Sequence, residues 1–136
     1  MTIIESKEVT IKGSCQQTFD FLKNLSNYHL LLPKDRISDW KADKKLCSFR
    51  IQNTYTITLV YNGANEPSTI MLISGEGSPL KFNLDLELTN ENPETTKAKM
   101  VCKADLNPFL KLMVEKPLKN LFDYMADRLV KVREEA

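Results

Sequence analysis

The sequence predicts an α+β fold in which a curved antiparallel sheet of about six to seven strands wraps around one long C-terminal helix. Two observations support this fold class. Apolar residues recur at every second position through the middle of the chain, and at helical spacing over its last thirty residues. With 136 residues, of which 42% are hydrophobic and 27% charged, the composition is ordinary for a globular protein. We therefore expect a single domain over residues 1–136.

The first strand is expected over residues 2–12. Glu5 and Lys7 fall at positions where the alternation calls for apolar side chains, so this strand is expected to contain a bulge or to lie at an edge.

Two short helices are expected after this strand. Ser14 followed by Gln17 has the spacing of a capping box, in which each side chain satisfies a backbone N–H at the helix start. This predicts a helix from about residue 15 to residue 24. A second, shorter turn is expected over residues 28–32, and Pro33 would end it because the residue before a proline avoids the helical conformation.

Period-two alternation then predicts a series of antiparallel strands that are buried on one face. Asn62-Gly63 has the composition of a tight turn between two of them. The strand at residues 69–74 is apolar on both faces, and there we expect Met71 and Ile73 to point inward. The expected strands cover residues 37–42, 47–52, 54–61, 69–74, 81–88 and 97–104.

The last element is expected to be a helix over residues 107–133, with Asp105 or Asn107 as a possible cap and Pro108 in its first turn. Pro117 lies inside it and predicts a kink, because it cannot donate a hydrogen bond to the Met113 carbonyl. The kink either bends the helix around the sheet or makes residues 109–116 a movable gate. The expected apolar stripe comprises Leu110, Met113, Val114, Leu118, Leu121, Met125, Leu129 and Val132.

Charge and cysteine content narrow the classes of function. Lysine and arginine number 19 against 18 acidic residues, so there is no basic excess for a nucleic-acid partner. No apolar run is long enough to span a membrane and no secretory signal is visible, so we expect a cytoplasmic protein. Cys15, Cys47 and Cys102 are far apart and odd in number, which favours free thiols, with Cys47 and Cys102 acting as small buried hydrophobic residues.

Residues that could perform chemistry are few. His29 is the one histidine, no G-x-S-x-G motif surrounds any serine, and no metal-ligand spacing occurs. We therefore assign no catalytic residue, no metal and no cofactor.

Several local strings along the chain together point to a known family. They are residues 16–22 (QQTFDFL), 25–28 (LSNY), Leu32-Pro33, 39–42 (DWKA) and 104–109 (ADLNPF). In these strings the sequence resembles the START-like, or SRPBCC, superfamily, which includes Bet v 1-type proteins, polyketide cyclases and coenzyme Q-binding proteins. The resemblance covers essentially the whole chain. It implies a helix-grip fold, with a hydrophobic cavity between sheet and helix that binds lipids, polyketides, hormones or quinones in most members.

The hypothesis that follows is non-catalytic binding of a small hydrophobic ligand, such as a lipid, polyketide or quinone-like molecule, between the sheet and the C-terminal helix. One alternative is a cyclase or aromatase in which His29, Tyr55 or Tyr61 transfers a proton. A second alternative is a packed-core module that acts through its surface. The expected ligand-binding residues are Trp40, Phe49, Ile51, Tyr55, Ile57, Leu59, Met71, Ile73, Phe82, Leu84, Met100, Leu110, Met113, Val114, Leu121 and Met125.

Overall fold

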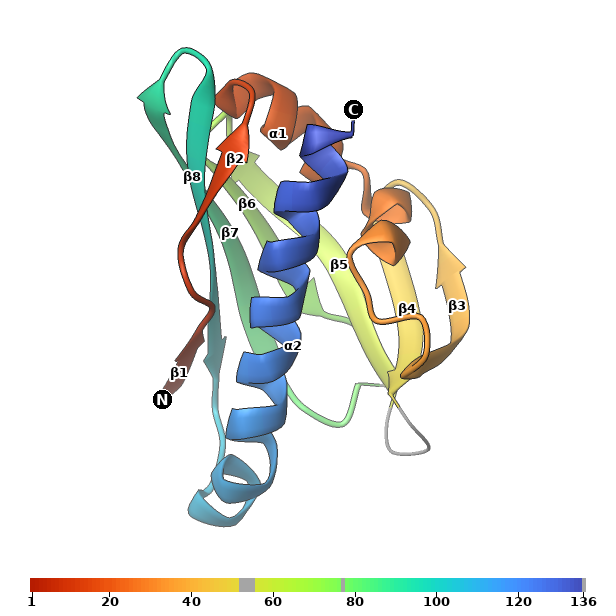
Figure 1. The fold of residues 1–136 in the computed structure, drawn as a ribbon. Helices are drawn as coiled ribbons and strands as arrows, with labels where there is room; N and C mark the ends of the chain where they lie inside the picture. Colours follow the sequence, from red (N-terminus) through yellow and green to blue (C-terminus); the bar gives the residue numbers. More distant parts are fainter. Residues whose placement is uncertain (52–55, 77, 136) are drawn as a thin grey trace.

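One antiparallel sheet and one long helix dominate the computed structural model, which describes residues 1–51, 56–76 and 78–135 (Figure 1). The expected α+β architecture is confirmed, with eight strands in the sheet of the described chain rather than six to seven. The elements are β1 (Thr2–Glu5), β2 (Val9–Lys12), α1 (Cys15–Lys23), the 3₁₀ helix η1 (Leu25–Leu30), β3 (Ile37–Ala42), β4 (Leu46–Ile51), β5 (Thr56–Asn65), β6 (Thr69–Ser74), β7 (Phe82–Asn92), β8 (Thr95–Ala104) and α2 (Pro108–Glu134).

The sheet order follows the sequence from β3 to β8, and the chain's first strands complete it. The order is β1-β8-β7-β6-β5-β4-β3, and β2 also pairs with β8. All of these pairs are antiparallel. The helix α2 lies along one face of the curved sheet (Figure 1) and packs most closely against β2 and β1.

The additional strand arises because the expected first strand is interrupted at Ser6. The Ser6 hydroxyl accepts a hydrogen bond from the Met100 N–H at 2.9 Å, while the Ser6 N–H donates to the Met100 carbonyl at 2.9 Å. The side chain thus replaces a backbone acceptor of the ladder, and β1 and β2 pair with β8 on either side of it. The predicted irregularity near Glu5 and Lys7 is confirmed.

The capping box at the start of α1 is confirmed. The Ser14 hydroxyl accepts from the Gln17 N–H at 3.2 Å, and the Gln17 side chain accepts from the Ser14 N–H at 3.0 Å. The second short helix begins earlier than expected, at Leu25, because the Asn24 side chain caps it by accepting from the Ser26 N–H at 3.1 Å.

The expected turn at Asn62-Gly63 is wrong. Both residues lie inside β5, where the pairing with β6 shifts register between Tyr61 and Ala64. Gly63 has a φ of 121°, a conformation that costs little without a Cβ, so the dipeptide forms a bulge within the strand.

The helix α2 begins as expected, with the Asn107 side chain accepting from the Leu110 N–H at 2.9 Å and Pro108 in the first turn. It continues through Pro117 to Glu134 without interruption. After Pro117 its buried residues include Leu118 and Phe122, which join the core formed with the sheet. The proline therefore does not end the helix.

Polar contacts hold the C-terminal part of α2 in place. Asp123 accepts a hydrogen bond from the Lys7 backbone N–H at 2.7 Å and lies 3.1 Å from the Lys119 ammonium. The Lys7 ammonium lies 2.7 Å from Asp127, and Arg128 donates to the Leu30 carbonyl at 3.2 Å. These contacts connect α2 to the segment between β1 and β2 and to η1.

The Asp123 carboxylate gives the fold an acid-sensitive contact. Desolvation raises its pKa, but the Lys7 N–H and the Lys119 ammonium lower it more, so the pKa lies below its usual value. A carboxylate with a lowered pKa stabilises the fold fully above its unfolded pKa of about 3.9, and that contribution disappears as the pH falls through the folded pKa.

The free energy of unfolding, measured with urea below pH ~4, should therefore fall less with decreasing pH for Asp123→Asn than for the wild type. Asp127→Asn, which removes an exposed ion pair, is the control, and an equal pH dependence in all three proteins would contradict the assignment.

Candidate functional site

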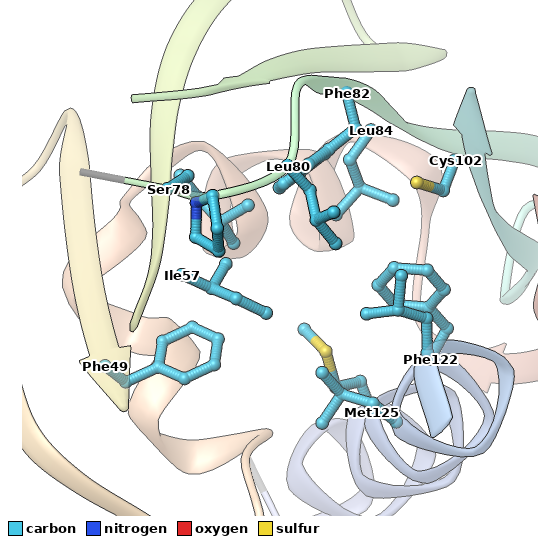
Figure 2. A pocket seen from close by; sticks show the side chains of 13 residues that line it. Phe49, Ile57, Ser78, Leu80, Phe82, Leu84, Cys102, Phe122 and Met125 are labelled. Atoms are coloured by element: carbon cyan, nitrogen blue, oxygen red, sulfur yellow. The ribbon is translucent and has the colours of Figure 1, made fainter. Parts of the chain in front are cut away.

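An apolar cavity lies between the sheet and the second half of α2, beneath the segment that joins β6 to β7 (Figure 2). Strands β4, β5, β7 and β8 supply one side of it, and α2 supplies the other. The residues that line it are Phe49, Ile57, Leu59, Ser78, Pro79, Leu80, Phe82, Leu84, Cys102, Leu118, Leu121, Phe122 and Met125.

The cavity is small in this conformation. Its volume is about 20 Å³, measured as the space open to the centre of a water-sized sphere. One water needs about 10–15 Å³ on that measure, and a site for a drug-sized ligand spans roughly 300–1,000 Å³. A ligand larger than a few atoms would therefore have to displace side chains or move α2 outward.

The accessible wall of the cavity is apolar. The Ser78 hydroxyl is occupied, because it accepts from the Thr58 N–H at 2.9 Å and donates to the Thr58 carbonyl at 3.4 Å. Burial raises the pKa of the Cys102 thiol to about 12, which keeps it neutral. Burial likewise raises the pKa of the nearby Cys47 thiol to about 12, although a hydrogen bond with the Leu59 backbone opposes the shift. Such a wall can exclude water and contact hydrocarbon.

Seven of the residues expected at a ligand site lie together on this wall. They come from three strands, β4, β5 and β7, and from α2, so the alternation in the sheet and the spacing in the helix converge on one place. They are Phe49, Ile57, Leu59, Phe82, Leu84, Leu121 and Met125.

The expected direction of two β6 side chains is wrong. Ile70 and Leu72 are fully buried, whereas Met71 and Ile73 lie on the opposite face of β6 and are partly exposed. Both faces of this strand are apolar, so alternation alone could not choose between them. The choice follows from register, which places Leu72 beside Leu84 and Met71 beside Asp85.

Met113 is also misplaced by the sequence pattern. Its side chain is 57% exposed, whereas the adjacent Val114 is 6% exposed and belongs to the core. Met113 falls on the solvent side of α2 because the buried face runs through Val114 and Leu118.

Four of the remaining expected residues lie outside the cavity wall. Trp40, Ile51 and Leu110 are partly buried and pack against the core. Met100 is buried but lines a separate void beside α1, and Tyr55 lies outside the described residues.

Six residues of the wall were absent from the expected set. Ser78, Pro79 and Leu80 belong to the connection between β6 and β7, for which the sequence gives no period. Leu118 and Cys102 were expected to face inward but were not assigned to the site. Phe122 could have been found from its spacing, because it lies four residues after Leu118 and three before Met125.

Two of the residues considered for proton transfer, His29 and Tyr61, do not line the cavity. The His29 ring centroid lies 5.8 Å from that of Trp40, which in turn lies 6.4 Å from Phe49, so two rings connect His29 to the wall. Tyr61 lines a different surface pocket, together with Lys44 and other residues.

Solved structures resemble the whole chain at low sequence identity. A START superfamily protein from Mycobacterium smegmatis matches with a TM-score of 0.76 and 12% identity over 98% of this chain and 97% of its own. Norcoclaurine synthase from Thalictrum flavum, in complex with dopamine and hydroxybenzaldehyde, matches with a TM-score of 0.74 and 12% identity over 98% and 87%. The fold is the START-like helix-grip fold. A conserved protein from Geobacillus kaustophilus matches this helix-grip fold with a TM-score of 0.70 and 16% identity over 94% and 93%.

Sequence comparisons add no closer relative, because no family model and no curated protein matches the chain. Among the described residues, no helix has the length and apolar character needed to cross a bilayer. The described residues also contain no cluster of three or more histidine, cysteine or acidic side chains suited to a metal ion.

Proposed function

We propose that the protein binds a small apolar molecule in the cavity between the sheet and α2, without catalysing a reaction. The observation that carries this proposal is the apolar wall, in which the one hydroxyl, that of Ser78, is already hydrogen bonded to the backbone. Such a wall favours a hydrocarbon ligand, because apolar surface removed from water contributes about 25 cal/mol per Å² to the binding free energy. The entropy that ligand and side chains lose on binding reduces this gain.

Binding requires the cavity to widen from its present volume. Met125 and Leu121 on α2 are the side chains best suited to this, because Met125 is flexible and Leu121 is only partly buried. The first turns of α2 do not form the cover, because none of residues 108–117 lines the cavity.

The test is a cavity-filling substitution. Wild-type protein is expected to bind the apolar dye N-phenylnaphthylamine, and Leu121→Trp is expected to weaken that binding at least about tenfold because the ring occupies the cavity. Val130→Trp is the matched control, since Val130 is a partly buried residue of the same helix that does not line the cavity. Equal dye binding by both variants, or none by the wild type, would overturn the proposal.

The second candidate is a packed-core module that acts through its surface, and the small cavity volume favours it. On this hypothesis the wild type takes up no dye. Native mass spectrometry of protein purified without detergent distinguishes the two, because only the first hypothesis expects a copurifying apolar molecule.

A further inference from the structure

The first turns of α2 carry an apolar surface that the fold does not cover. Phe109 is 69% exposed, Leu112 is 85% exposed and Met113 is 57% exposed. Large apolar side chains are uncommon on an open helix surface when they lie together, so a patch of this kind indicates an interaction. We call these three residues the α2 tip patch.

The geometry of the helix excludes the protein's own core as the partner of the patch. At about 100° per residue, the three side chains share one arc of about 100°. That arc faces away from the side of α2 on which Val114 and Leu118 are buried. A bend of the helix toward the sheet would therefore leave the patch in solvent.

The same solvent face changes character after the patch. Lys116 falls within the arc one turn later, and the face then continues with Asn120, Asp123 and Asp127. The apolar surface is thus confined to the end of α2 that extends past the sheet (Figure 1). A protruding helix end can insert into a lipid surface, whereas a ligand site is normally concave.

The charges beside the patch favour an anionic partner. Residues 108–117 contain Lys111 and Lys116 against Glu115, which leaves one net positive charge. Neither lysine has an ion-pair partner among the described residues. The dipole of α2 adds a partial positive charge at the same end.

The area argues against a second copy of the chain. At the exposed fractions of its three side chains, the patch exposes on the order of 400 Å² of apolar surface, the size of the largest apolar patch on a typical monomer, which is often functional. A stable protein–protein interface takes about 800 Å² from each partner. A membrane interface has no such requirement, because a few inserted apolar side chains and nearby lysines act together there.

We propose that the α2 tip patch docks the protein on the surface of membranes that contain anionic phospholipids, with Phe109, Leu112 and Met113 inserted and Lys111 and Lys116 near the phosphates. This docking does not depend on occupation of the cavity, and it leaves the fold peripheral to the bilayer.

The test is cosedimentation with vesicles of equimolar phosphatidylcholine and phosphatidylglycerol. The wild type is expected to bind them, and to bind phosphatidylcholine vesicles less. The triple variant Phe109→Ala, Leu112→Ala, Met113→Ala should lose at least about tenfold in partitioning while the helix is retained, because alanine favours helix. Leu46→Ala removes an exposed leucine of β4 and is the control.

A second variant tests the proposal even if the triple variant does not fold. The double variant Lys111→Glu, Lys116→Glu should bind the mixed vesicles more weakly than the wild type does. Its binding to vesicles of phosphatidylcholine alone should fall much less. Leu121→Trp should leave vesicle binding unchanged, which separates docking from uptake of lipid into the cavity. Absence of wild-type binding, equal binding by the triple variant, or a wild-type dimer that the triple variant abolishes would each overturn the proposal.

Discussion

Replacing Phe122 with alanine is expected to lower the free energy of unfolding by about 3–5 kcal/mol. Phe122 is 5% exposed, lies on α2 and forms part of the cavity wall. Removing its ring takes away apolar burial and enlarges a void that the surrounding helix and strands cannot fully close. Urea unfolding followed by circular dichroism measures the loss.

Tyr124→Ala is the matched control for Phe122→Ala. Tyr124 is an aromatic residue of the same helix, two positions away and 38% exposed, so its loss should cost much less, about 1 kcal/mol or below. Equal losses would contradict the placement of Phe122 in the core. The Phe122→Ala protein should also take up N-phenylnaphthylamine more readily than the wild type, because the same substitution widens the cavity.

Replacing Pro117 with alanine is expected to raise the free energy of unfolding by up to about 3 kcal/mol. Pro117 is exposed and lies inside α2, where it cannot donate to the Met113 carbonyl and where its ring crowds the preceding turn. Alanine restores the donor without removing a buried contact. Thermal and urea unfolding both measure the gain.

Lys116→Ala is the control for Pro117→Ala, because it changes an exposed neighbour and leaves the backbone donor in place. The gain should be specific to position 117. A loss of stability in Pro117→Ala would show that the geometry imposed by the proline is needed for α2 to follow the sheet at Leu118.

The fold was largely predictable because its elements carry strong local signals. The capping box at Ser14, the alternation in β7 and the spacing from Leu118 to Leu129 each specify an element without knowledge of its partners. Errors arose where the local signal was compatible with two structures. Asn62-Gly63 suits both a turn and a bulge, and pairing with β6 decides for the bulge.

The candidate site was predictable only in part, because a cavity depends on which side chains meet. Met113 and Val114 are adjacent and both apolar, and the sequence cannot tell which of them faces the sheet until the helix is docked. Ser78 and Leu80 lie in a connection without a periodic pattern, so their place on the wall is a result of tertiary packing. The volume of the cavity is likewise a result of tertiary packing and cannot be predicted from the sequence pattern.

The pairing of β1 and β2 with β8 has a consequence for biosynthesis. Their partner β8 lies about 90 residues later in the sequence, so Ile4 and Ile11 leave the ribosome long before the strand with which they pair. The hairpins from β3 to β8 can assemble in the order of translation, whereas the N-terminal strands must wait. Such distant pairing slows folding, and it makes the pairing of β1 and β2 with β8 a late event.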